Sequence, residues 1–279
     1  MFTTYLPQNE IDLHEYINSH DALFHFCKPE DALSIIKTNQ FILTPMKDLD
    51  DPFESAMNFE FINTLSSSND QKKAEKIAFN IYSSKLDKMK TGSFCSNIPA
   101  HVFVDEKKLK NSNLDLKAWQ RSRMWSQYAK DKEYKGHAGA CLVFSRETLI
   151  KECKKSSAEL ILCSGISYRS KLKKPIFNCT QAFEKGEKEY LKDFLKEESN
   201  IDHLFFQKFI DYRDANEFRI GLWKKDNAEI NTSASIKGII LGDKIAEELA
   251  GKFKEVKNEK NIEVINISFQ NGSPKLTTL

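Results

Sequence analysis

Apolar and polar positions alternate along the chain with two different periods, and each period predicts a different kind of element. Short apolar runs bounded by polar turns are typical of buried strands. Helices are predicted where apolar residues recur every three or four positions. The strand pattern covers residues 22–28, 41–45, 92–97, 137–145, 158–170, 217–223, 235–242 and 262–269, and the helical pattern covers residues 8–20, 28–40, 116–131, 182–211, 243–258 and most of 54–90.

These elements do not follow the regular strand-helix-strand order of a parallel sheet. No internal repeat and no linker rich in proline or glycine divides them, and the stretch SSSND at residues 66–70 is interpreted as a loop. The sequence therefore predicts an α+β fold in a single domain, residues 1–279, with charged helices packed around a sheet.

The composition is that of an ordinary globular protein, and it narrows the choice of partners. Of the 279 residues, 40% are hydrophobic and 29% are charged, and 42 basic against 40 acidic residues give a formal net charge of +2. Such a balance gives no global field that would draw the chain to nucleic acid or to an anionic membrane. The Lys and Glu residues that alternate over 183–198 are interpreted as a solvated face.

Targeting and cysteine patterns predict a cytoplasmic protein. The first residues, MFTTYLPQNEIDLHEY, lack a basic start followed by a long apolar stretch, and no run approaches the roughly 18 apolar residues of a membrane span. Six cysteines are scattered without a CxxC pair, mainly in apolar runs, which favours buried reduced thiols over a disulfide framework.

Three common kinds of functional site find little support in the sequence: a nucleophilic cysteine, a glycine-rich nucleotide-binding loop and a zinc site. Cys27 follows His25 by two positions, but nothing around it predicts the lowered pKa of a nucleophilic thiol. Neither GxxxxGK[ST] nor GxGxxG occurs, which argues against a P-loop enzyme or a Rossmann dehydrogenase. Four residues offer zinc ligands, but their spacings form no compact pair of ligand turns, so no metal site is predicted: Cys95, His101, His137 and Cys141.

Three polar or aromatic islands remain inside apolar surroundings: His25 in LFHFCKPEDALSII, Tyr128 in MWSQYAK and Glu217 in DANEFRIGLW. Each alone fits a purely structural role. The histidine fits a hydrogen-bonded core position, the tyrosine fits core packing, and the glutamate fits a surface ion pair with Arg219. The segments around them, taken in order, favour a functional interpretation.

The order of these segments resembles a known bacterial family across nearly the whole chain. FHF followed by ALSII, LTP followed by DDPFE, FCS, MWSQYA followed by KGHAGACLVF, NEFRI and IKGIILG occur in the order and spacing of the family called domain of unknown function 2971. That family is similar in turn to the ADP-ribosyltransferases whose catalytic residues are a histidine, a tyrosine and a glutamate in this chain order. The resemblance implies an ADP-ribosyltransferase-like fold, with a split mixed or antiparallel sheet core surrounded by helices and a helical insertion near residues 54–90.

Carried over by position, the resemblance places His25, Tyr128 and Glu217 in one catalytic site that takes NAD as its substrate. Cleavage of the bond between nicotinamide and ribose passes through an oxocarbenium-like transition state. Glu217 would stabilise the positive ribose, His25 would bind the adenosine-side ribose or the pyrophosphate, and Tyr128 would stack on nicotinamide. NAD contacts are expected from His25, Thr44, Asp51, Ser96, Trp125, Tyr128 and Arg219.

Several neighbours of these residues are expected to support the site. Trp125 lies one helical turn before Tyr128 and is expected to pack beneath it. Arg219 shares a strand face with Glu217, so it either orients that carboxylate or meets a phosphate. Gly136 and Gly139 are expected to let the chain turn back into the sheet without a Cβ conflict.

Three functions are compatible with this site. The first is an NAD-dependent ADP-ribosyltransferase that modifies an unknown macromolecule, a protein or a nucleic acid, as a bacterial toxin or anti-phage effector. The second is an NAD glycohydrolase, with water as the acceptor. The third is a non-catalytic nucleotide sensor or interaction module, suggested by Phe26 and Cys27, which stand where the family favours tyrosine and threonine. No metal and no membrane partner are predicted, and the sequence says nothing of the oligomeric state.

Overall fold

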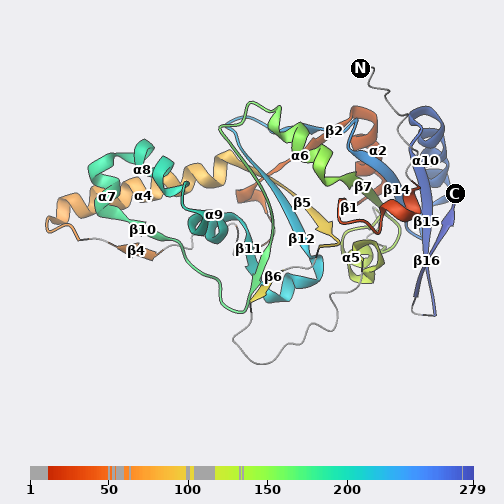
Figure 1. Ribbon diagram of the computed structural model, residues 1–279, viewed down its shortest axis with the longest axis horizontal. Helices are drawn as coiled ribbons and strands as arrows, with labels where there is room; N and C mark the ends of the chain where they lie inside the picture. The colour runs from red at the N-terminus through yellow and green to blue at the C-terminus, as the bar shows by residue number, and fades with distance from the viewer. Residues whose placement is uncertain are drawn as a thin grey trace, which may run out of the picture.

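The protein has a mixed α+β fold with a mostly antiparallel open sheet, which confirms the predicted class (Figure 1). The computed structural model describes residues 12–49, 51, 54, 60–62, 64–98, 101–103, 117–131, 133, 135–271 and 273–279. The main sheet has the order β16 (Ser273–Thr278), β15 (Glu263–Gln270), β14 (Ile236–Leu241), β7 (Ala140–Ser145), β1 (Ala22–Cys27), β5 (Met89–Ser96), β12 (Glu217–Trp223) and β8 (Leu160–Gly165), and β3 (Thr44–Pro45) pairs with β5. β14 and β15 are parallel, and the other neighbours in this order are antiparallel.

The sheet separates between β1 and β5. β1 pairs with β7 along its whole length, from Ala22 to Cys27. Within the described strands, β1 pairs with β5 at Leu23 and Phe24 alone. β5 in turn pairs with β12 along the full length of β12, from Glu217 to Trp223. The backbones of β1 and β5 therefore diverge beyond Phe24, and side chains from both strands border the space that opens there.

Helix α2 (Pro29–Thr38) follows β1 directly and lies beside this opening. Pro29 occupies the first helical turn, where a missing N–H costs no hydrogen bond. Ala32, Leu33 and Ile36 lie on the buried side of the helix and join the main core. The helix ends at Asn39, whose φ of 54° is left-handed, and the chain turns there into β2 (Gln40–Ile42).

The helical insertion predicted near residues 54–90 is present in part. Its helix is α4 (Ser68–Lys88), which begins inside the stretch interpreted as a loop. Residues 60–62 form a strand, β4 (Glu60–Ile62), instead of a helix. β4 pairs with β10 (Ile176–Asn178), and α4 packs with α7 (Cys179–Lys185) and α8 (Glu187–Phe194) around a hydrophobic cluster of its own, at the left of Figure 1.

The remaining described elements surround the sheet. β2 pairs with β13 (Glu229–Asn231), and β6 (His101–Phe103), β9 (Ser167–Arg169) and β11 (Gln207–Phe209) form a small parallel sheet. The helices are α1 (Leu13–Tyr16), α5 (Ser122–Gln127), α6 (Arg146–Lys154), α9 (Glu198–Phe205) and α10 (Glu247–Lys260), and the 3-10 turns are η1 (Met46–Asp48), η2 (Ala118–Gln120) and η3 (Ile210–Ala215).

Three predicted helices differ from the structure. The helix expected over 116–131 is divided into η2 and α5, because Arg121 between them is extended and its guanidinium donates to the Asp214 carbonyl at 2.6 Å. The region 182–211 contains three short helices and β11 instead of one long helix. Helix α10 begins at Glu247 and not at Asp243, and a strand that was not predicted, β16, follows the expected last strand.

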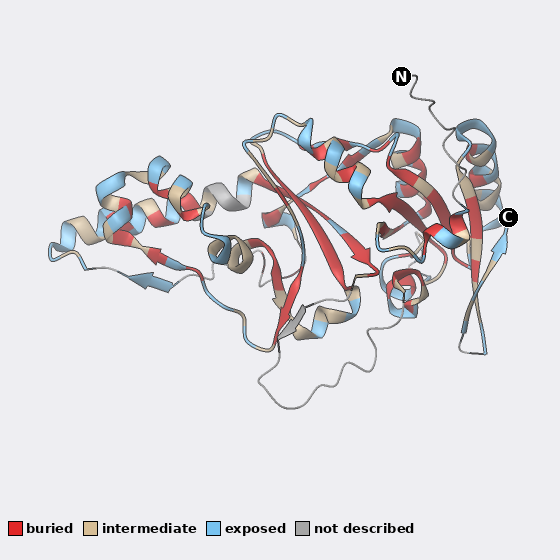
Figure 2. Cartoon of the chain, viewed as in Figure 1, coloured by how far each residue is buried: buried red, intermediate tan, exposed pale blue. Residues whose placement is uncertain are grey.

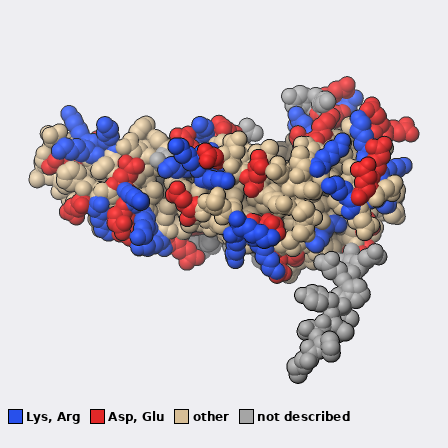
Figure 3. All heavy atoms as spheres, turned by 90° about the horizontal axis from the view of Figure 1, so that it is seen from above, with Lys and Arg blue, Asp and Glu red and all other residues tan. Residues whose placement is uncertain are grey.

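Buried residues are concentrated in the sheet, and charged side chains of both signs lie on the surface. Figure 2 shows buried residues concentrated along the central strands, with exposed residues on the outer faces of the helices. On the face drawn in Figure 3, Lys and Arg are interspersed with Asp and Glu, in keeping with the near-zero net charge. Within the described part of the chain, no helix is both long and apolar enough to cross a membrane.

The backbone of Gly139 lies very close to the backbones of Ala129 and Cys27 where the chain enters the sheet, as expected. A Cβ at this position would lie 2.5 Å from the backbone of Ala129 and 2.5 Å from the Cys27 carbonyl oxygen. We predict that Gly139→Ala lowers the free energy of unfolding by about 1–3 kcal/mol, measured by urea denaturation. Gly251→Ala is the matched control, because nothing lies within 4 Å of its Cβ position in α10. Alanine should stabilise that helix by up to about 1 kcal/mol, and equal effects at both positions would contradict the prediction.

Candidate active site

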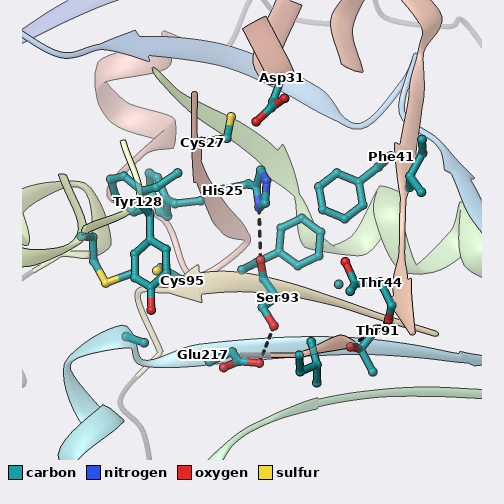
Figure 4. Close-up of a pocket in the computed structure, with 18 of the residues that line it drawn as sticks. His25, Cys27, Asp31, Phe41, Thr44, Thr91, Ser93, Cys95, Tyr128 and Glu217 are labelled. Carbon is teal, nitrogen blue, oxygen red and sulfur yellow. Dashed lines mark hydrogen bonds between the residues drawn. The ribbon is translucent and has the colours of Figure 1, made fainter. Parts of the chain in front are cut away.

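A pocket of about 710 Å³ lies where β1 and β5 separate. This volume is within the range of small-molecule and cofactor sites. Its wall includes β1, β5, α2 and β2 on one side and the start of β12, with β11 and η3, on the other. Figure 4 shows His25, Ser93 and Glu217 one above another in this pocket, with Tyr128 beside them and Asp31 beyond His25.

Glu217 reaches the pocket because local contacts fix the first residue of β12. Asn216 precedes it with a left-handed φ of 43°, and its side-chain amide donates to the carbonyl oxygens of Ser96 and Ile98. The backbone N–H of Glu217 donates to the Tyr168 hydroxyl at 2.9 Å. Asparagine tolerates this conformation better than most residues, so it suits the turn that leads into the strand.

The Glu217 carboxylate is buried and held by three side chains. Ser93 Oγ donates to Oε1 at 2.7 Å, Arg219 Nε donates to the same oxygen at 2.8 Å, and Lys208 Nζ lies 2.7 Å from Oε2. Burial alone would raise the pKa of Glu217, but the positive charges of Arg219 and Lys208 outweigh it and lower this pKa to about 2. The carboxylate is therefore ionised throughout the physiological range.

Glu54, which also lines the pocket, completes a buried cluster of charges around Glu217. Arg219 pairs with both carboxylates, and Lys208 lies 3.3 Å from Glu54 Oε2. Burial lowers the pKa of Lys208, but the Glu217 and Glu54 carboxylates more than offset it, and the net shift is upward. Asp51, three residues before Glu54, also lines the pocket.

His25 lies across the pocket from Glu217 and contacts the same residue of β5. Its Nδ1 donates to the Ser93 carbonyl oxygen over 3.3 Å, and its ring meets Phe41 edge-on with 4.8 Å between centroids. Burial lowers the pKa of His25, so the ring is neutral at neutral pH. With the proton on Nδ1, Nε2 is an acceptor for a ligand hydroxyl.

The lowered pKa of His25 predicts a loss of stability in mild acid. Protonation favours the unfolded chain, because the folded pKa lies below the ordinary value of 6.5. The stabilisation from the neutral ring is therefore complete above pH 6.5 and is lost as the pH falls from 6.5 toward the folded pKa. His25→Asn keeps a donor near Nδ1 but cannot titrate. Urea unfolding between about pH 7.5 and about pH 5 should show a larger loss for the natural protein than for this variant; equal losses would refute the assignment.

Of the two aromatic residues Trp125 and Tyr128, in and directly after α5, one lies in the core and the other lines the pocket. The Tyr128 side chain is 49% exposed and lines the pocket. Trp125 is fully buried, meets Phe26 edge-on with 5.1 Å between centroids and donates from Nε1 to the Trp119 carbonyl oxygen. Trp125, for which an NAD contact was predicted, is therefore part of the core and not of the pocket lining.

Of the other residues predicted to contact NAD, some line the pocket and others do not. Thr44 and Asp51 line the pocket. Ser96, for which a contact was also predicted, does not line the pocket: it is 4% exposed and its hydroxyl accepts the Ile98 backbone N–H. Arg219 is 1% exposed behind Glu217, so it orients the carboxylate and does not reach a phosphate in the pocket.

Ser93 and Lys208 were not identified from the sequence. Ser93 lies on the pocket side of β5, three residues before Ser96, and only the strand register distinguishes the two. Lys208 falls in FFQKFID, which was predicted to be helical, although it is in β11. A lysine inside an apolar run was the one available signal for a buried ion pair.

The candidate thiols and metal ligands have surroundings that do not activate them. Burial raises the pKa of the Cys27 thiol, and burial raises the pKa of Cys95 to about 12, so neither is an activated nucleophile. Among the described residues, no group of three or more His, Cys, Asp or Glu side chains is placed to hold a metal ion. The His101 side chain lies outside the described part of the structure.

Comparison with known proteins connects part of this site to a family. Residues 124–220 match the sequence profile described as "Protein of unknown function (DUF2971)". The match supports the DUF2971 family. The DUF2971 match includes Tyr128, Lys208, Glu217 and Arg219, but it does not extend to the β1 and β5 strands that carry His25 and Ser93. No curated protein and no solved structure matches the chain.

Proposed function

We propose that this protein is an NAD-dependent ADP-ribosyltransferase whose substrate occupies the pocket between His25 and Glu217. The observation that carries the proposal is that these two side chains, from strands far apart in the sequence, both hydrogen-bond to Ser93. His25 donates to the Ser93 carbonyl oxygen, and Glu217 accepts from the Ser93 hydroxyl. One is a carboxylate whose low pKa keeps it ionised at physiological pH, and the other is a neutral imidazole whose Nε2 can accept a hydrogen bond. Both line a pocket large enough for a cofactor-sized ligand.

The charge at the Glu217 end suits the cationic half of NAD. Nicotinamide carries a positive charge before the bond to ribose breaks, and the ribose becomes positive as it breaks. The carboxylates of Glu54 and Glu217, which line the pocket, would favour both states. The exposed ring of Tyr128 lies at the same end, where it offers a face to nicotinamide.

The low pKa of Glu217 decides which role it can take. A carboxylate with a pKa of about 2 is a weak base, so it contributes little by taking a proton from the acceptor. We assign it electrostatic stabilisation of the ribose cation and a hydrogen bond from a ribose hydroxyl. In the reaction, the electron pair of the broken bond stays on nicotinamide, the acceptor forms a new bond to the anomeric carbon, and the acceptor's proton passes to water.

Incubation with NAD labelled in the adenylate phosphate tests this function. The purified protein and a bacterial lysate should yield free nicotinamide together with label on a macromolecule. Nicotinamide release with free ADP-ribose as the only labelled product would instead identify an NAD glycohydrolase. If NAD is bound but remains intact, the protein is a nucleotide sensor, and if NAD is neither bound nor consumed, the pocket serves another ligand.

A further inference from the structure

The pocket has a second polar region, on the face of α2 beyond His25. Asp31, Ser34 and Thr38 recur there at helical spacing and line the pocket, and Gln40 follows them on β2. The residues between them on the other face of α2 are buried in the core. The helix therefore presents these polar residues to the pocket together with Ile35, and Asp31 lies on the far side of His25 from Glu217 (Figure 4).

The charges of this region differ from those around Glu217. Asp31 is exposed to the pocket beside His25, close enough for its negative charge to oppose the fall in the histidine pKa. Among the described residues that line the pocket, Lys208 is the one lysine or arginine, and it is held between two carboxylates at the opposite end. The α2 end thus offers a carboxylate, hydroxyls and an amide, and none of its described lining residues is a lysine or arginine that could meet a phosphate.

We propose that Asp31 makes the pocket selective for a dinucleotide with a free adenosine ribose, NAD, over its 2′-phosphorylated form, NADP. This inference rests on the proposed function. With the nicotinamide ribose at Glu217, the adenosine ribose lies toward His25 and α2. A ribose hydroxyl donates to the Asp31 carboxylate, and His25 Nε2 accepts from the same sugar. A phosphate monoester at the 2′ position carries about −1.5 to −2 charges and meets a carboxylate instead of a cation.

The alternative orientation gives a different result. If the dinucleotide were reversed, the 2′-phosphate would lie at the Glu217 end, away from Asp31, and Asp31→Asn would leave the ratio of the two affinities unchanged. The effect of Asp31→Asn on this ratio therefore reports on the orientation as well as on Asp31.

Calorimetric titration with NAD and with NADP tests this proposal on three forms of the protein. The natural protein should bind NAD about tenfold or more tightly than NADP. Asp31→Asn should bring the two affinities closer together, chiefly by improving NADP, because the amide removes the repulsion and keeps the size of the side chain. Asp226→Asn, which removes an exposed carboxylate outside the pocket lining, should leave the ratio as it is in the natural protein.

The outcomes separate this inference from the proposed function. Equal affinities of the natural protein for NAD and NADP, or an unchanged ratio in Asp31→Asn, would overturn the role of Asp31 while NAD consumption stands. No binding of either dinucleotide to the natural protein would overturn both. A circular dichroism spectrum and thermal transition like those of the natural protein verify that Asp31→Asn is folded.

Discussion

Glu217→Gln should lower the rate of NAD consumption by about 100- to 1000-fold, the usual effect of removing one group that stabilises charge in a transition state. Glutamine has nearly the same shape and can still accept from Ser93 and Arg219, but it carries no negative charge toward the ribose. The measurement is the initial rate of nicotinamide release at saturating NAD.

Glu54→Gln is the matched control for that experiment. It removes a carboxylate from the same buried cluster and disturbs the same two cations, Lys208 and Arg219. We expect it to lose at most about tenfold in rate, because the contact with the ribose is assigned to Glu217 and not to Glu54. Equal rate losses in the two variants would show that the cluster as a whole, and not the Glu217 charge at the sugar, sets the rate.

Arg219→Met should lower the free energy of unfolding by about 3–5 kcal/mol, because removing one partner of a buried ion pair leaves uncompensated charge behind. The guanidinium is 1% exposed and pairs with both Glu54 and Glu217, while its Nη1 also donates to the Phe205 carbonyl oxygen. Lys208 alone would then face two carboxylates. Urea denaturation at neutral pH measures the change.

Arg123→Met provides the comparison for this variant. Arg123 also pairs with an aspartate, at 2.8 Å from Asp214, but both side chains are about half exposed, at 47% and 49%. A pair in that setting contributes about 0.2–1 kcal/mol. A loss at Arg219 no larger than at Arg123 would mean that the buried cluster does not stabilise the fold as we describe.

The strands that carry the candidate site could be predicted from the sequence, but the register of their pairing could not. Apolar runs identified β1, β7, β12 and β14, because a short apolar run between polar turns is typical of a buried strand. The place of a side chain on a strand depends on pairing with residues far away in the chain. The sequence favoured Ser96, whereas Ser93 faces the pocket, and a shift by an odd number of residues moves a side chain to the other face.

Contacts between distant segments account for the remaining differences. From the sequence, Trp125 was expected to pack beneath Tyr128 and also to contact NAD, because an aromatic beside Tyr128 fits either a core or a pocket. Its packing against Phe26 on β1 places it in the core. The ion pair of Lys208 with Glu217 joins β11 to β12 across η3 and leaves no periodic signal in the sequence. His25 and Glu217 were placed together by the family resemblance and not by any pattern of polar residues.

The most direct measurement of the central claim is a crystal structure of the protein with a non-cleavable NAD analogue. Our account predicts that the anomeric carbon of the nicotinamide ribose lies within about 3–4 Å of the Glu217 carboxylate, with the nicotinamide against Tyr128 and the adenosine ribose beside His25. An analogue bound outside this pocket, or one with its nicotinamide ribose at the α2 end, would contradict the account.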